Sequence, residues 1–199
     1  MHPLPRPAHV LPPPVRQHGM VLIITLVMLF VMTMVMMSAM RSNISEERMA
    51  GNARDWTTAF QAAESALRDA ERDIAGTRIS GETGFVSGCS SDGKCKVSTT
   101  GTPVWVSLLA TDPGWISGAV SSTKTVGYGS FTAAVGVVAL PDVAAQPRYI
   151  IEAMSVPPMG SLKVGQSTGS VDYLYRVTAV GFGRNIASRV MLQGVYRQY

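Results

Sequence analysis

Histidine is scarce in this sequence, and its position is as informative as its number. The chain has three histidines, His2, His9 and His18, and all of them precede Met20. From Met20 onward the sequence therefore lacks the commonest general base and cannot supply a Ser-His-Asp arrangement. We accordingly identify no catalytic residue, and we expect a non-enzymatic protein that needs no cofactor.

Charged residues are also few, at 15% of the chain, and they do not cluster. The formal net charge is +4, but the Lys and Arg residues are scattered singly, which argues against nucleic-acid binding. Two carboxylate pairs occur, Glu46/Glu47 and Asp69/Asp73. Both pairs lie in a segment predicted to be helical, where we interpret them as surface charge and not as a paired acid and base.

Proline is missing from a long interval, because six of the twelve prolines fall in the first 14 residues and the next is Pro103. Proline disrupts helix interiors, so this interval leaves room for a long helix. It contains a run of 21 uncharged residues, Met20 to Met40, which has the length of a membrane span. A secretory signal has a shorter apolar region and an A-x-A cleavage pattern that this sequence lacks. A buried core helix would seldom be apolar on all sides for this length.

The charges that flank the apolar run predict its orientation. Arg6 and Arg16 precede the run, whereas Arg41 and Arg48 follow it together with two glutamates. This bias favours a cytoplasmic N-terminus. We therefore expect a single-pass membrane protein in which everything after Met40 lies outside the cytoplasm.

Beyond the apolar run, nothing in the sequence clearly stops the helix. An apolar stripe recurs at alternating spacings of four and three residues, which is one face of a helix, and its members are Trp56, Phe60, Ala63, Leu67, Ala70 and Ile74. One helix is therefore predicted from Met20 to about Ile74, roughly 80 Å long. Glu64 and Arg68 form an i,i+4 pair on it, and Gly76 is a suitable C-terminal stop.

The remainder of the chain is predicted to be rich in strands. Three alternating segments near the end indicate antiparallel strands over 148–154, 173–183 and 188–198. Two shorter apolar runs, 103–109 and 130–140, are also interpreted as strands, and 155–170 as a loop. If the apolar stripe covers one face of this sheet, the fold is α+β. The predicted parts are 1–19 as a leader, 20–40 as the transmembrane helix, 41–75 as its amphipathic continuation and 76–199 as the head.

Cysteine is limited to Cys89 and Cys95, which flank a turn signal in the segment GCSSDGKCK. In an oxidising compartment this spacing predicts a disulfide within one loop. Two free buried thiols are the alternative. A metal site is not expected, because two cysteines without a histidine do not complete a tetrahedral zinc site.

A basic leader that ends in Gly, an apolar helix that continues as an amphipathic one and a strand-rich remainder together resemble type IV pilins, and in particular the PilX-type minor pilins. The resemblance rests on HGMVLIITLVMLF and on SAMRSNISEERMAGNARDWTTAFQAAESALRDAE near the start. Near the end it rests on QPRYIIE and YRVTAVGFGRNIASRVMLQGVYRQ. It covers residues 19–71 and 146–198.

The resemblance implies a defined processing step. Prepilin peptidase would cut between Gly19 and Met20 and methylate the new amino terminus of Met20. Pilins of the fibre shaft carry a glutamate five residues into the mature chain, but this sequence has Ile24 there. We therefore expect a subunit of the tip or of the initiation complex. The implied partners are other minor pilins, the major pilin, the prepilin peptidase, the inner-membrane assembly platform and, before assembly, membrane lipid.

Three other functions remain as alternatives. A pseudopilin of a type II secretion system would share the same leader and helix. A membrane-anchored periplasmic enzyme is a further alternative, although the lack of histidine weighs against it. An adhesin-like module at the tip overlaps the first interpretation, with contacts expected in the loops 76–102 and 155–170. The family resemblance also links the chain to adhesion and twitching motility.

Overall fold

The computed structural model describes residues 19–118, 122–132, 139–156 and 172–198. The first element is a single helix, α1, which runs over Met20–Ala75 as predicted. The chain divides within this helix into two compact units, Met1–Arg48 and Met49–Tyr199, which are described separately. The leader up to residue 18 lies outside the described residues, as does almost the whole loop predicted over 155–170.

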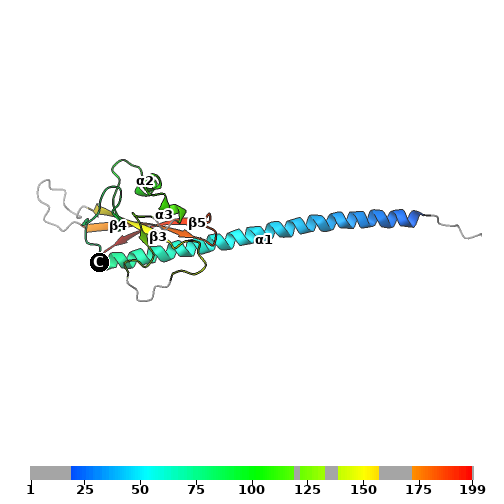
Figure 1. Ribbon diagram of the computed structural model, residues 1–199, viewed down its shortest axis with the longest axis horizontal. Helices are drawn as coiled ribbons and strands as arrows, with labels where there is room; N and C mark the ends of the chain where they lie inside the picture. Colours follow the sequence, from blue (N-terminus) through cyan, green and yellow to red (C-terminus); the bar gives the residue numbers. More distant parts are fainter. Residues whose placement is uncertain (1–18, 119–121, 133–138, 157–171, 199) are drawn as a thin grey trace, which may run out of the picture. The chain divides into compact units, whose positions relative to one another are not determined.

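The second unit contains a five-stranded mixed sheet (Figure 1). Its strands are β1 (Lys94–Lys96), β2 (Val126–Gly127), β3 (Arg148–Val156), β4 (Asp172–Phe182) and β5 (Arg189–Arg197). β3, β4 and β5 confirm the three predicted strands, and they form an antiparallel meander. The sheet is not antiparallel throughout, because β1 pairs with β3 in parallel while β2 pairs with β3 in antiparallel.

The segment 103–109 was wrongly predicted as a strand, because most of it belongs to helix α2 (Val104–Thr111). Pro103 occupies the N-cap position, and the buried residues Val104 and Leu108 are spaced by four, so one helical face is covered. A short helix, α3 (Gly114–Ser117), follows. In the segment 130–140, Ser130–Thr132 form a turn, residues 133–138 lie outside the described residues, and no strand is assigned to the rest.

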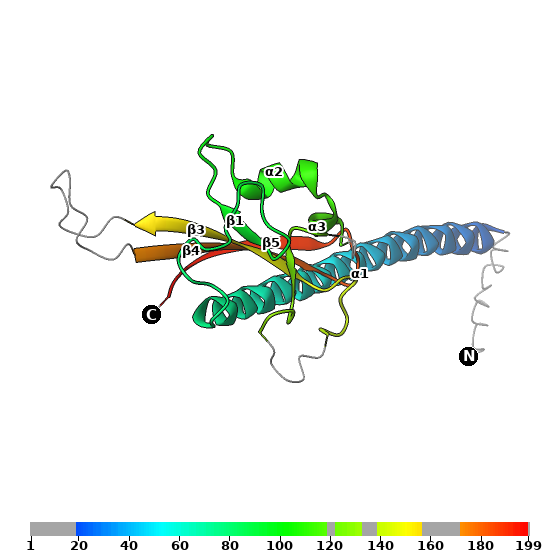
Figure 2. The same ribbon diagram turned by 60° about the vertical axis from the view of Figure 1, so that its left-hand side comes forward.

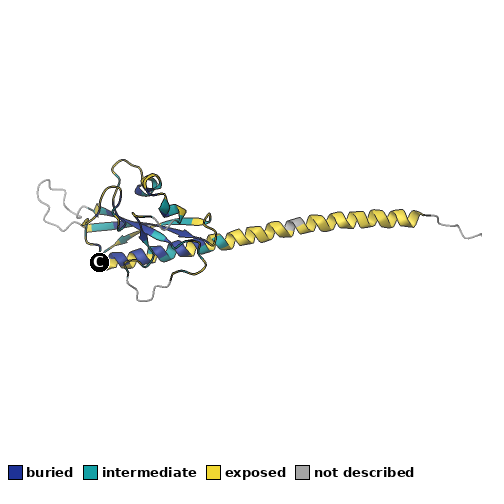
Figure 3. Cartoon of the chain, in the orientation of Figure 1, coloured by how far each residue is buried: buried dark blue, intermediate teal, exposed yellow. Residues whose placement is uncertain are grey.

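Both faces of the sheet are covered, so the second unit has two hydrophobic clusters. Alternate residues of β4 point to opposite faces: Tyr175, Val177 and Ala179 pack with α1, whereas Val180 and Phe182 pack with α2, α3 and the two cysteines. Figure 2 shows α1 on one side of the strands and α2 and α3 on the other. Figure 3 shows the buried residues concentrated in the strands and in the part of α1 beside them.

On the face of β4 toward α1, the side chains become smaller along the strand. Tyr175, Val177, Ala179 and Gly181 follow one another on this face. A Cβ atom built on Gly181 would lie 2.2 Å from the Ala63 nitrogen and 2.4 Å from the Ala59 oxygen, so the backbones of β4 and α1 are in direct contact there. On the helix, the facing residues are Ile74 at one end and alanines toward the other.

Candidate assembly interface

The first unit presents an apolar surface that is fully exposed. Every residue from Met20 to Met40 is exposed (Figure 3). Among the described residues, α1 is the helix that is long and apolar enough to cross a membrane. The hydroxyls of Thr25 and Thr33 donate to the carbonyls of Leu22 and Phe30, at 2.9 and 2.8 Å, so these donors are satisfied within the helix. The surface is therefore suited to lipid or to other apolar helices.

The predicted cleavage position lies where α1 begins. Gly19 adopts a left-handed conformation with φ +73°, and no atom lies within 4 Å of where its Cβ would be. A residue without a side chain in this conformation leaves the backbone open to close approach. Met20 starts the helix, and Ile24 is 55% exposed one turn later. The side chain at the position of the shaft glutamate is thus an exposed aliphatic one.

The predicted helix stripe is only partly correct. Ala63, Ala70 and Ile74 are buried against the sheet, and Leu67 is partly buried there. Trp56 and Phe60, however, are 57% and 36% exposed, which corrects their predicted place on the sheet. Their rings stack on each other with centroids 5.7 Å apart. The difference arises because the contact beside them is made by the backbones at Ala59 and Gly181, which leaves no space for an aromatic ring.

The carboxylates Asp69 and Asp73 were wrongly interpreted as surface charge, since they are only 1% and 3% exposed. Asp69 accepts hydrogen bonds from the Gly129 amide at 2.7 Å and from the Thr132 hydroxyl at 2.5 Å. Buried charge is tolerated only with such partners. These partners are about 60 residues away, so the sequence of α1 contains no signal for them. Glu46 and Glu47 are exposed, as expected of surface charge.

Asp73 belongs to a network centred on Arg78. Arg78 donates to both carboxylate oxygens of Asp73, to the Asp92 carbonyl at 2.9 Å and to the Asp92 carboxylate at 3.2 Å. Its guanidinium also lies 4.1 Å from the Phe131 ring centroid. Burial alone would lower the pKa of Arg78, but the hydrogen bond to Asp73 and its charge outweigh burial and raise that pKa. This network fastens the loops after α1 to the helix.

Tyr149 joins the same network from β3. Its hydroxyl donates to Asp73 over 3.0 Å, and the residue is fully buried. Burial, followed by the negative charges of Asp73 and Asp69, raises the pKa of this hydroxyl far above its ordinary value. Tyr149 therefore remains a neutral hydrogen-bond donor at any physiological pH.

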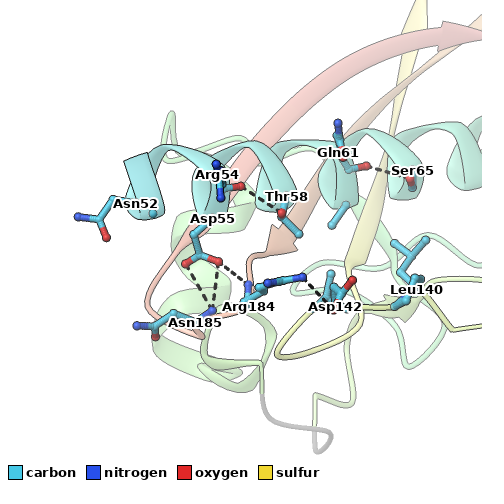
Figure 4. Close-up of a pocket in the computed structure, with 14 residues that line it drawn as sticks. Asn52, Arg54, Asp55, Thr58, Gln61, Ser65, Leu140, Asp142, Arg184 and Asn185 are labelled. Carbon is cyan, nitrogen blue, oxygen red and sulfur yellow. Dashed lines mark hydrogen bonds and ion pairs between the residues drawn. The ribbon is translucent and has the colours of Figure 1, made fainter. Parts of the chain in front are cut away.

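A groove of about 980 Å³ runs along the flank of α1 (Figure 4). Its wall on the helix is polar, and its opposite wall comes from the 140–143 segment and the β4–β5 turn; the lining residues include Asn52, Arg54, Thr58, Gln61, Leu140 and Arg184. An exposed ion pair of 3.1 Å between Arg184 and Asp142 lies at this wall. Positively charged, negatively charged and hydroxyl side chains all line the groove, so its charge favours neither an anionic nor a cationic ligand.

Asp55 attaches the β4–β5 turn to α1. Its carboxylate accepts hydrogen bonds from the backbone amides of Arg184 and Asn185. A hydrogen bond from the Ser188 side chain lowers the pKa of Asp55 and, together with these amides, outweighs the opposite effect of partial burial. The sequence analysis missed this residue, although the glycines at positions 181 and 183 could have indicated a close approach of another backbone.

Cys89 and Cys95 form the predicted disulfide. Cys95 is fully buried and Cys89 is 7% exposed, and both pack with Trp115, Leu108 and Phe182. The bond therefore fixes β1 within the hydrophobic cluster on the α2 face of the sheet. The described residues contain no group of His, Cys, Asp or Glu side chains that could hold a metal ion.

A charged pair with one fully buried member lies on the same face of the sheet. Glu152 of β3 is fully buried, and its two carboxylate oxygens accept from the Arg176 guanidinium at 2.9 and 2.7 Å. The hydrogen bond with Glu152 raises the pKa of Arg176 and outweighs the opposing effect of burial. The two residues face each other across β3 and β4, so the pair favours the correct register of these strands.

Comparison with protein families gives two matches. The family model for the PilX N-terminal region matches residues 18–68, and the model described as type IV pilus assembly protein PilX C-term matches residues 87–198. The chain has no significant match to a curated protein or to a solved structure. The two matched regions together contain the start of α1, the disulfide and all five strands.

Proposed function

The chain belongs to the PilX family of type IV pilus assembly proteins, and from this premise we propose that it primes the pilus together with other minor pilins and stays at or near the tip. The family gives the coarser function of a minor pilin, a structural subunit in pilus assembly. The position within the fibre and the priming role are the proposal. Under this proposal, adhesion and twitching motility would depend on the chain only through the presence of pili.

The observation that carries this proposal is the composition of the exposed first part of α1. From Met20 to Met40 it has no ionisable side chain, and Ile24 stands where shaft pilins have a glutamate. A carboxylate in an apolar bundle requires a partner. A subunit without one cannot accept the terminal amine of a neighbour, which excludes it from the repeated contact of a shaft. One end of the fibre is the position that does not require that contact.

The processing step follows from the same segment. Prepilin peptidase would cut after Gly19 on the cytoplasmic side and methylate Met20, so the apolar helix is kept and not discarded. Before assembly the helix spans the inner membrane with its N-terminus in the cytoplasm. During assembly it leaves lipid and packs on the helices of other minor pilins or of the major pilin. Its seven methionines are flexible and suit unlike neighbours.

Mass spectrometry of the protein from membranes tests the processing. We expect a chain that starts at N-methylated Met20, and an uncut chain in the Gly19→Ala variant. An uncut wild-type chain, or one that starts after Ala39, would contradict the proposal.

Immunogold labelling of pili tests the position. We expect label at one end of the fibre, and many copies spaced along the shaft would rule out a tip subunit. Deletion of the chain separates this function from that of a type II secretion pseudopilin. Lost pili with intact secretion support the pilus, whereas lost secretion with intact pili supports the pseudopilin.

A further inference from the structure

The loop between the two cysteines reaches both faces of the sheet. The cysteines lie six positions apart and close this disulfide loop, residues 89–95, at β1, which ends the strand order. They pack in the cluster on the α2 face, whereas Asp92 within the loop contacts Arg78, which in turn is hydrogen-bonded to Asp73 of α1. The disulfide loop therefore connects a covalent bond on one side of the sheet with the charged network at the end of α1.

Bonds within the disulfide loop set the position of Asp92. The Ser90 amide donates to the Lys94 carbonyl at 3.0 Å, and the Gly93 amide donates to the Ser90 carbonyl at 3.1 Å. The Ser90 hydroxyl donates to the Asp92 carboxylate. None of the residues between the cysteines is hydrophobic, so little burial offsets the entropy lost when they are ordered. The disulfide restricts the open loop and thereby reduces this loss, so we expect the position of Asp92 to depend on the bond.

The disulfide loop holds Arg78 at both its side chain and its backbone. The guanidinium donates to the Asp92 carbonyl at 2.9 Å and to the Asp92 carboxylate at 3.2 Å, while the Lys94 ammonium donates to the Arg78 carbonyl at 3.2 Å. Arg78 in turn donates to both oxygens of Asp73, whose side chain is only 1% exposed. A displaced Arg78 would leave this buried carboxylate with the Tyr149 hydroxyl as its side-chain partner in the described part of the chain, and a buried charge that loses its counter-ion is strongly destabilising.

We propose that the disulfide is a redox switch that controls how firmly the end of α1 is held on the sheet. With the bond closed, the loop holds Arg78 and Arg78 holds Asp73. With two free thiols, the loop releases Arg78, and residues 70–79 open more often. Closure forms the sulfur–sulfur bond and passes two electrons and two protons from the thiols to a disulfide-bearing oxidant, which becomes a dithiol. The inference rests on the proposed function, because export to the periplasm brings the reduced chain to such an oxidant.

Hydrogen exchange of the full-length chain in detergent, followed by mass spectrometry, tests the switch. The oxidised chain is compared with the same chain after reduction. We expect the amides of residues 70–79 to exchange about tenfold faster in the reduced chain, because local opening governs their exchange. The amides of residues 59–66, beside Gly181, should exchange at the same rate in both states. A change confined to residues 86–96 would contradict the inference.

Asp92→Asn provides a second measurement that keeps the disulfide, and it decides the matter if reduction unfolds the whole head. The change removes the charge that faces Arg78, so residues 70–79 of the oxidised chain should exchange about threefold faster or more. In the reduced chain the same change should add nothing, because both changes release the same contact. Asp142→Asn, in an exposed pair with Arg184, is the matched control and should leave this exchange unchanged. Unchanged exchange in the oxidised Asp92→Asn chain would refute the switch.

The deletion strain separates the switch from the proposed function. If deletion leaves pili intact, the proposed function fails whatever the exchange of residues 70–79 shows. If deletion abolishes pili but neither reduction nor Asp92→Asn changes that exchange, the switch fails and the proposed function stands.

Discussion

The contact between α1 and the sheet depends on residues with almost no side chain. At Gly181 the backbone of β4 touches the backbone of α1 at Ala59 and Ala63, so even a methyl group has no space. At Asp55, just beyond this contact, a carboxylate satisfies the amides of the β4–β5 turn. Single atoms at these positions therefore decide how closely the helix and the sheet approach.

Gly181→Ala is expected to destabilise the second unit by about 3 kcal/mol or more, because the added Cβ would require the helix to move. Urea unfolding of the full-length chain in detergent, followed by Trp fluorescence, measures the change. Gly51→Ala is the matched control, since no atom lies within 4 Å of its Cβ position. It should stabilise the chain by about 0.5–1 kcal/mol through helix propensity. Equal effects of both changes would contradict the close contact.

Asp55→Asn should lower the stability at neutral pH but not in acid. The pKa of Asp55 is lower in the folded chain than in the unfolded chain. Its contribution is therefore present above the unfolded value of about 3.9 and is lost as the pH falls through the folded value. The difference in Tm between wild type and variant should be constant from pH 7 to 5 and shrink below about pH 4. A constant difference down to pH 2 would exclude this origin.

Asp142→Asn is the control for that experiment. Asp142 forms an exposed ion pair with Arg184 beside the same turn, and its side chain is 66% exposed. Exposed pairs contribute little to stability, so its Tm should stay close to that of the wild type.

The long elements could be predicted from the sequence and the short ones could not. α1, β3, β4 and β5 have patterns that repeat over nine or more residues, so neighbouring positions support the same assignment. The segment 103–109 is apolar without a clear period, and a short run of this kind does not distinguish helix from strand. The burial of Asp69 and Asp73 depends on loops that are distant in sequence. The exposure of Trp56 depends on glycine and alanine contacts beside it.

The pairing of β3 with β4 provides a prediction at the element scale. Arg176→Met leaves the fully buried Glu152 without its guanidinium, and the loss of the partner of a buried carboxylate costs up to about 3 kcal/mol. Glu152→Met together with Arg176→Met should recover most of this loss, because the remaining site is apolar on both strands. Denaturant unfolding of the three chains measures it. A double variant no more stable than the single one would contradict this explanation.

The whole molecule consists of two compact units with different surfaces. The first exposes apolar side chains over Met20–Met40, whereas the second contains both hydrophobic clusters, the disulfide and the charged network. The division falls after Arg48, next to the polar residues that end the apolar run. The hydrophobic core and the exposed apolar run are thus in different parts of the chain.

The fragment from Met49 to Tyr199, exported to the periplasm, should fold without detergent. We expect one cooperative thermal transition with a Tm near that of the head in the full-length chain. Reduction of the disulfide should lower its stability by about 2 kcal/mol, because the loop that it closes is short. Calorimetry with and without reductant measures both. A fragment that aggregates or melts without a cooperative transition would show that the first unit is needed for folding.

The stepwise decrease in side-chain size from Tyr175 to Gly181 on β4 has a mechanical consequence. If the first part of α1 holds the subunit in a fibre, as proposed, tension on that fibre pulls α1 toward its N-terminal end. The pull draws Ile74, at the wide end, toward the narrow end, where the strand and the helix backbone already touch. Sliding in this direction meets rising steric resistance. The helix is therefore seated like a wedge, and the load that would extract it from the sheet presses it more firmly into place.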